Sequence, residues 1–193
     1  MAKKDVIIGL GEIGLPLFNL ISKFTIAEGY DIKPELRNKP KFSQYENLDV
    51  LFLHICIPFS KNFFREIYSL YKKYHPQAIV IHSTVSPYTT KNLQKKLSIP
   101  VIYSATRGIH KRMLSDLKRY TKFYAIEPKA PRAKWASSAF SLLMKKCGIK
   151  TKKMSSPVTL ELAKILVDTS YYGWLINYAQ ITNAVALQHK VSY

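Results

Sequence analysis

The chain has 193 residues, of which 47% are hydrophobic and 22% charged, and its formal net charge at pH 7 is +18. This composition suits one compact domain with a full core and excludes an intrinsically disordered chain. No apolar run is long enough to span a bilayer, and two cysteines, Cys56 and Cys147, are too few for a disulfide framework. We expect a cytoplasmic protein without membrane contact, because the N-terminus runs directly into a predicted strand and shows no cleavable signal peptide.

The first predicted elements form one continuous pattern. A buried strand at 4–10 is followed by a G-x-G-x-x-G turn at 9–14, a helix at 15–21 and a short strand at 24–27 that runs towards Asp31. This order of strand, glycine turn, helix, strand and acidic residue is typical of a dinucleotide-binding site. The alternative interpretation is a Rossmann-like domain that keeps the turn for packing alone.

The residues of this pattern have separate predicted tasks. Gly9 allows the tight turn, Gly11 lets backbone approach a pyrophosphate, and Gly14 lets the helix pack closely against the strand. The helix N-terminus offers free N–H groups and a partial positive charge to the phosphates. Asp31 is predicted to accept hydrogen bonds from the adenosine ribose and to repel a 2′-phosphate, which favours NAD over NADP. The predicted cofactor contacts in this segment are Gly9, Gly11, Glu12, Ile13, Gly14 and Asp31.

Strands and helices alternate along the rest of the sheet domain, after a proline-containing connection at 32–47. The predicted strands are 49–57, 78–82, 101–103, 123–126 and 149–152, and the predicted helices are 61–74, 89–97, 113–120 and 131–147. This alternation predicts an α/β fold with a doubly wound parallel sheet of the Rossmann type.

The pattern changes at Pro157. From there to about Leu187 the chain has no further proline and one glycine, which predicts a single helix of roughly 30 residues. We therefore divide the chain into a dinucleotide-binding domain, 1–154, and a helical segment, 155–193. The helix carries too many apolar and aromatic residues for one contact face, so part of it should form an interface.

Four segments together resemble the UDP-glucose/GDP-mannose dehydrogenase family. Residues 9–17 resemble that family's opening G-L-G-x-x-G-L-P, and residues 55–58 resemble its strand-end C-V-P. Residues 83–90 resemble its S-T-V-x-P-G-T-T, and residues 161–169 resemble the A-E-x-x-K-L-x-x-N-T stretch that opens its long central helix. The four segments follow the family's order over nearly the whole chain.

The resemblance implies an NAD-binding domain followed by a helix that forms a homodimer. It implies that Ile57 and Pro58 lie beside the nicotinamide half of NAD, and it adds Ser83 and Thr84 to the cofactor-binding residues. The implied reaction is hydride transfer on a polar or anionic substrate, with a nucleotide sugar among the candidates.

The chain departs from the family at the residues that carry its full chemistry. The family's catalytic cysteine lies in a later segment, before a nucleotide-sugar domain, and neither Cys56 nor Cys147 has its sequence context. Residues 104–106, Ser-Ala-Thr, stand where the family has S-P-E with a catalytic glutamate, and Asp168 stands in place of an asparagine. Because the family oxidises an alcohol to an acid through a thioester, the same four-electron reaction is not expected here.

Three side chains are candidates for catalysis. Lys164 and Asp168 are four residues apart on one helix face, and the resemblance turns that face towards the cleft. There they could serve as acid/base and orienting group in a hydride transfer; the alternative is a plain surface ion pair. Thr84 follows the carboxyl end of a strand, where such sheets bind ligands, although a threonine there can also cap a helix.

Arg107 and His110 occupy the loop after the predicted strand 101–103 and could bind a substrate carboxylate or phosphate, or simply form a basic loop. No spacing of histidine, cysteine and acidic residues predicts a metal site. Two hypotheses about function follow. One is an NAD-dependent oxidoreductase; the other is a non-catalytic Rossmann protein whose basic surface binds nucleic acid or a protein partner, although scattered lysines favour ordinary solvated faces.

Overall fold

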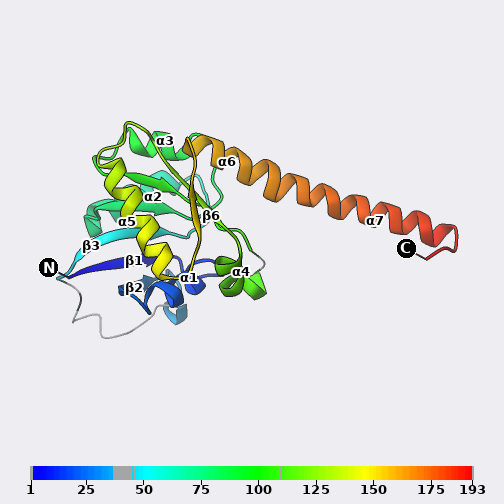
Figure 1. The fold of residues 1–193 in the computed structure, drawn as a ribbon, viewed down its shortest axis with the longest axis horizontal. Coiled ribbons are helices and arrows are strands. Elements are labelled where there is room, and N and C mark those ends of the chain that lie inside the picture. The colour runs from blue at the N-terminus through cyan, green and yellow to red at the C-terminus, as the bar shows by residue number, and fades with distance from the viewer. Residues whose placement is uncertain (1, 37–44, 46, 109, 193) are drawn as a thin grey trace.

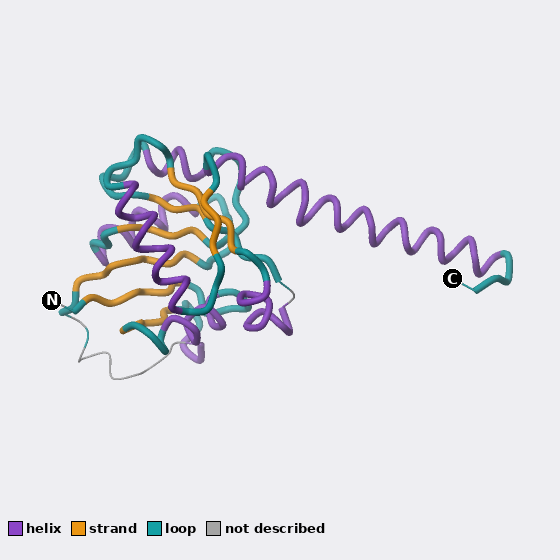
Figure 2. Tube along the Cα trace, in the orientation of Figure 1, coloured by secondary structure: helices purple, strands orange, loops and turns teal. Residues whose placement is uncertain are grey.

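A computed structural model describes residues 2–36, 45, 47–108 and 110–192. Figure 1 shows a layered α/β body and a long helix that leaves it and ends far away. In these described ranges seven strands form one sheet in the order β2-β1-β3-β4-β5-β6-β7, with helices outside it (Figure 2). The strands are β1 (Lys3–Ile8), β2 (Ile26–Tyr30), β3 (Asp49–Ile55), β4 (Ala78–Ile81), β5 (Val101–Tyr103), β6 (Lys122–Ile126) and β7 (Thr151–Lys153). The helices are α1 (Gly14–Ile21), α2 (Phe63–Tyr74), α3 (Thr89–Gln94), α4 (Met113–Arg119), α5 (Ala133–Lys146), α6 (Pro157–Ile165) and α7 (Tyr172–Gln188).

The predicted doubly wound α/β fold is confirmed, and the sheet is parallel except at one pair. Strands β2, β1, β3, β4 and β5 are mutually parallel, whereas β6 runs antiparallel to β5, with Ile102 opposite Ile126. The connection between these two strands contains a 3-10 turn, His110–Arg112, and the seven-residue helix α4. After α4 the chain enters β6 from the end of the sheet at which β5 stops, so β6 runs against β5.

Two apolar layers hold the helices on the sheet. On one face, Leu17 and Ile21 of α1 and Phe140 of α5 pack against Phe52 and Val80 of the central strands. On the other face, strand and helix residues form a second core from Val6, Leu53, Ile79, Phe63 and Ile67. The central strands are buried on both faces, which explains why 49–57 and 78–82 are almost continuously apolar in sequence.

Some predicted boundaries shift. Strand β2 begins at Ile26, later than the predicted 24–27, because the turn after α1 leaves Phe24 half exposed. Strand β7 covers Thr151–Lys153, whereas 149–152 was expected, since Ile149 is used in the core instead of the ladder. In the predicted connection 32–47, residues 34–36 form a 3-10 turn, and residues 37–44 and 46 lie outside the described part of the chain.

The long C-terminal helix is confirmed. Ser156 caps α6 by accepting a hydrogen bond from the Thr159 N–H, and Pro157 occupies the first turn, where its missing N–H costs nothing. A π-helical turn at Leu166–Tyr171 joins α6 to α7, giving a continuous run of 32 residues. No buried residue occurs in α7, all of which the structure describes, and the helix projects away from the body (Figure 1). Among the described residues, no helix combines the length and apolarity needed to cross a membrane.

Candidate functional site

A cavity of about 990 Å³ opens at the carboxyl ends of β1, β3 and β4. Because these strands are parallel, the segments that follow them meet at one edge of the sheet. The cavity is lined by every residue that the sequence predicted for the cofactor except Gly14: Gly9, Gly11, Glu12, Ile13, Asp31, Ile57, Pro58, Ser83 and Thr84. Its volume lies at the upper end of the range for small-molecule and cofactor sites.

The three glycines of the turn differ in what surrounds them. Gly9 has φ +87°, and a Cβ there would lie 2.9 Å from the Cys56 carbonyl oxygen. A Cβ on Gly14 would lie 1.7 Å from the Gly9 carbonyl oxygen, so this glycine lets α1 pack onto the strand and does not face the cavity. A Cβ on Gly11 would meet nothing within 4 Å. Gly11 therefore leaves open space at the cavity wall, as close approach of a pyrophosphate requires.

Asp31, at the end of β2, is hydrogen-bonded to the glycine turn. Its Oδ2 accepts a hydrogen bond from the Leu10 N–H at 2.7 Å, and its Oδ1 accepts one from the Lys33 N–H at 2.9 Å. Both carboxylate oxygens therefore hold backbone of the segments that border the cavity. The carboxylate thus has a structural task in addition to the predicted ligand contact.

The region predicted to lie beside the nicotinamide is formed by the segments after β3 and β4, which a hydrogen bond joins. The Ser83 hydroxyl donates to the Ile57 carbonyl oxygen at 2.5 Å, joining the segment after β4 to the segment after β3. Thr84, next in the chain, is exposed at the cavity rim. Burial raises the pKa of the Cys56 thiol to about 12, so this cysteine is not a thiolate nucleophile at neutral pH.

A second, smaller pocket of about 150 Å³ lies between β6, α4 and the start of the long helix. Its lining contains Arg107, Lys164 and Asp168, so the structure brings together three residues predicted for catalysis and substrate binding. Asp168 lies between the two cations: its Oδ1 is 3.2 Å from Arg107 Nε, and its Oδ2 accepts from Lys164 Nζ at 3.2 Å. The Lys164–Asp168 pair is thus an ion pair and also part of a pocket wall.

The π-helical turn at Leu166–Tyr171 contains Asp168. Such turns are rare and often occur at functional sites, because the extra residue changes the direction of the side chains that follow. Thr169 and Ser170 donate their hydroxyls to carbonyls five residues back, Lys164 and Ile165, which satisfies carbonyls in this wider turn. Asp168 is held here at 13% side-chain exposure.

Thr106 connects the small pocket with the cavity. Its N–H donates to the His82 carbonyl oxygen at 3.2 Å, and His82 immediately precedes Ser83 and Thr84 on the cavity rim. Its own carbonyl oxygen accepts from Lys164 Nζ at 2.9 Å. Lys164 is therefore joined through Thr106 to His82, which lies two residues before the catalytic candidate Thr84.

Two polar residues in the small pocket were not predicted from the sequence. Lys122 is buried, and its ammonium donates to the Ser104 carbonyl oxygen at 2.8 Å and to the Thr106 hydroxyl at 3.0 Å. Burial lowers the pKa of Lys122 from 10.5 to about 7. Tyr103 is also buried, and its hydroxyl has no hydrogen-bond partner among the described residues. In the sequence both residues look like ordinary strand positions. They come together in this pocket only because β6 lies antiparallel beside β5.

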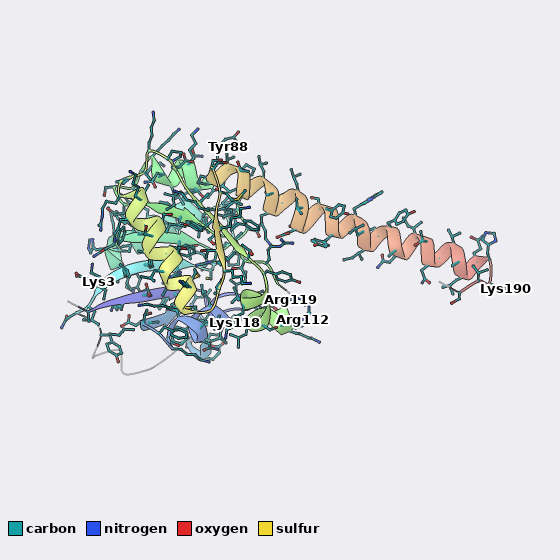
Figure 3. All side chains as sticks on the ribbon, in the orientation of Figure 1. Lys3, Tyr88, Arg112, Lys118, Arg119 and Lys190 are labelled. Carbon is teal, nitrogen blue, oxygen red and sulfur yellow. The ribbon has the colours of Figure 1, made fainter. Side chains whose placement is uncertain are left out.

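Glu161 anchors the long helix to the body. Its carboxylate accepts hydrogen bonds from the N–H groups of Tyr88 and Thr90 and from the Thr90 hydroxyl, at 2.7 to 2.8 Å. Figure 3 shows Tyr88 where the helix leaves the body. In sequence this glutamate is only one letter of the family motif, and its fully buried position was not predicted.

The remaining loop candidates are partly described. Arg107 lines the small pocket, and its guanidinium lies 5.7 Å from the centre of the Tyr120 ring. His110 begins a 3-10 turn, His110–Arg112, but its side chain is outside the described part of the structure. Within the described ranges, no group of His, Cys, Asp and Glu side chains is arranged to hold a metal ion.

Comparison with family models and with curated proteins finds no match. Solved structures of dehydrogenases share the fold. The UDP-D-ManNAc dehydrogenase of Pyrococcus horikoshii matches with a TM-score of 0.67 at 15% identity, over 83% of this chain and 49% of that chain. The chain therefore spans about half the length of that enzyme.

Two further structures cover nearly all of this chain. The 3-hydroxyisobutyrate dehydrogenase of Mycobacterium tuberculosis, solved with L-serine, has a TM-score of 0.72 at 14% identity over 100% of this chain and 67% of that chain. The prephenate dehydrogenase of Aquifex aeolicus, solved with hydroxyphenyl propionate and NAD+, has a TM-score of 0.65 at 16% identity, covering 96% and 70% of the two chains. The chain has the Rossmann-like fold of these dehydrogenases.

Proposed function

We propose that this protein is an NAD-binding oxidoreductase that transfers a hydride between the cofactor and a polar or anionic substrate, as a relative of the UDP-glucose/GDP-mannose dehydrogenase family. The observation that carries this proposal is the 990 Å³ cavity, whose lining gathers the predicted cofactor residues from four separate segments of the chain. The open space at Gly11 and the N-terminus of α1 suit a pyrophosphate, and Asp31 suits a ribose.

A bound nicotinamide would supply the hydride acceptor or donor. The chain's own residues would handle the proton and the substrate. Lys164 uses two N–H groups on the Thr106 carbonyl and the Asp168 carboxylate, which fixes the ammonium and leaves one N–H for a substrate oxygen. Asp168 orients Lys164 and Arg107 together, so that both cations are aligned on one pocket.

The cofactor assignment is tested by calorimetric titration of the full chain with NAD and with NADP. The proposal expects saturable binding of NAD and weaker binding of NADP, because Asp31 would repel a 2′-phosphate. Tighter binding of NADP would overturn the cofactor assignment. Absence of binding by either dinucleotide at millimolar concentration would overturn the function.

We also propose that the protein forms a homodimer through the long helix. From Thr169 to Gln188 the sequence carries no charged residue. On α7 large apolar side chains are exposed on every side, including Trp174 at 63% and Ile176 at 60%. A helix that is apolar all round is normally covered, and a second copy of the same uncharged helix is a chemically matched cover.

A further inference from the structure

We infer that the small pocket binds the carboxylate of a small molecule through the hydroxyl of Tyr103 and the guanidinium of Arg107. The inference deepens the proposed function, because it takes this pocket as the substrate end of the site. Neither Tyr103 nor the size of the pocket entered the sequence-based predictions.

The Tyr103 hydroxyl is a donor for which the described residues provide no acceptor. The side chain is fully buried and lines the pocket, and among the described residues no acceptor lies in hydrogen-bonding geometry. Burial raises the pKa of this phenol, so it keeps its proton at neutral pH; the N–H of Val85 faces its oxygen and opposes that shift. Buried polar groups are nearly always paired, so the free O–H points to a ligand atom that accepts a hydrogen bond.

The charges around the pocket favour an anion. Its lining carries three basic side chains, Arg107, Lys122 and Lys164, against two carboxylates, Asp116 and Asp168. Asp168 is already shared between two cations, and the Arg112 guanidinium lies 3.9 Å from Asp116. With Asp116 offset by Arg112, Arg107 and Lys164 face the single carboxylate of Asp168, so the pocket keeps a positive excess without counting Lys122.

Arg107 is the cation best placed for a planar anion. Among the described residues, its ion pair with Asp168 is made through Nε, and its side chain is 39% exposed. The terminal N–H groups can therefore form the two parallel hydrogen bonds by which arginine holds a carboxylate. Lys122 has its N–H groups on protein oxygens and offers none to a ligand.

The size of the pocket limits the ligand. An engineered protein cavity of about 150 Å³ holds benzene, which has six carbon atoms, so this pocket accepts a molecule of about three or four carbons with its oxygens. Leu117, Leu160 and Val167 supply an apolar wall for such a carbon chain. A nucleotide sugar is several times larger and cannot enter the pocket as a whole.

The test is a ligand-observed NMR titration of the full chain with lactate, lactamide, inorganic phosphate and UDP-glucose, without dinucleotide. Lactate should bind, and lactamide, which lacks the charge, should bind at least ten-fold more weakly. Tyr103→Phe and Arg107→Gln should each weaken lactate binding at least ten-fold. The matched controls Tyr68→Phe and Arg119→Gln, which remove the same groups outside the pocket lining, should leave it unchanged.

Each variant is checked by thermal unfolding, and if Tyr103→Phe does not fold, Arg107→Gln and the lactamide comparison carry the test. Equal binding of lactate and lactamide, or unchanged binding by Tyr103→Phe or Arg107→Gln, would overturn the inference. Preferential binding of UDP-glucose or of inorganic phosphate would overturn the assigned ligand. Because no dinucleotide is present, failure here is distinct from failure to bind NAD.

Discussion

Lys164 on the long helix donates a hydrogen bond to the carbonyl oxygen of Thr106, 58 residues earlier in the chain, at 2.9 Å. This bond joins the helix to the loop after β5, and Asp168 completes the arrangement by accepting from Lys164 and pairing with Arg107. The position of the catalytic candidate is therefore set jointly by the helix and by the loop at the sheet edge.

Removal of the shared carboxylate should show how far this arrangement contributes to stability. Asp168→Ala leaves Arg107 and Lys164 facing each other without a counter-charge, so we expect a loss of about 1–2 kcal/mol in the free energy of unfolding. Asp168→Asn, which keeps the shape and one acceptor, should lose less. Urea unfolding measures both; equal stability of Asp168→Ala and wild type would mean that the ion pairs are not formed in solution.

The Glu161 anchor gives a local prediction. Glu161→Ala removes the acceptor for three donors, the part-buried N–H of Tyr88 and the buried N–H and hydroxyl of Thr90, and should destabilise the protein by about 2–4 kcal/mol. The amides of Tyr88 and Thr90 should then exchange faster with solvent than in wild type or in the exposed control Glu35→Gln. Unchanged exchange at both amides would contradict the anchor.

The lowered pKa of Lys122 leads us to expect that stability depends on pH. Its pKa is about 7 in the folded state and 10.5 when unperturbed, so between these values the unfolded state holds more protons. The free energy of unfolding contributed by this group should therefore rise with pH across this window, by up to about 1.4 kcal/mol per unit. Lys122→Met should lack this rise. Stability curves of the two proteins that run parallel from pH 7 to 10 would contradict the lowered pKa.

The homodimer is testable by the effect of salt on its association. An uncharged helix interface should survive high ionic strength, so light scattering in roughly molar salt should give the mass of a dimer. Ile176→Lys introduces a charge on the exposed helix and should give monomers, whereas Tyr68→Lys on α2 should not. A monomer under the same conditions would contradict the proposal.

How much could be predicted from the sequence depends on how local each feature is. The glycine turn, α1 and the long helix are set by residues close together in the chain, and their positions follow from periodicity and spacing. The cavity lining at Ile57 and Thr84 followed from the family resemblance together with the rule that parallel strands end at one edge. The ligand roles of these residues stay predictions.

The small pocket could not be predicted in the same way. It depends on β6 running antiparallel to β5, which brings Lys122 under the loop at 104–106, and on a π-helical turn that places Asp168 beside Arg107. Neither the strand direction nor the extra residue in the turn has a local sequence signal. The unpaired Tyr103 hydroxyl is likewise visible only once its surroundings are known.

The ribose contact is tested by Asp31→Ala, which should weaken NAD binding by about 1–3 kcal/mol, the scale of leaving hydrogen-bonding groups unpaired. Since Asp31 also accepts from the Leu10 N–H, Asp31→Asn is the control that keeps a side-chain oxygen for that amide. Unchanged affinity in Asp31→Ala would mean that the carboxylate does not contact the ribose.

The most direct test of the central claim is calorimetric titration of NAD into wild type and Gly11→Val. A Cβ at Gly11 meets no protein atom within 4 Å, so the variant should fold and unfold like wild type. Its side chain should fill the space of the pyrophosphate and abolish NAD binding. Equal NAD affinity in a folded Gly11→Val variant, or no NAD binding by wild type, would contradict the dinucleotide site.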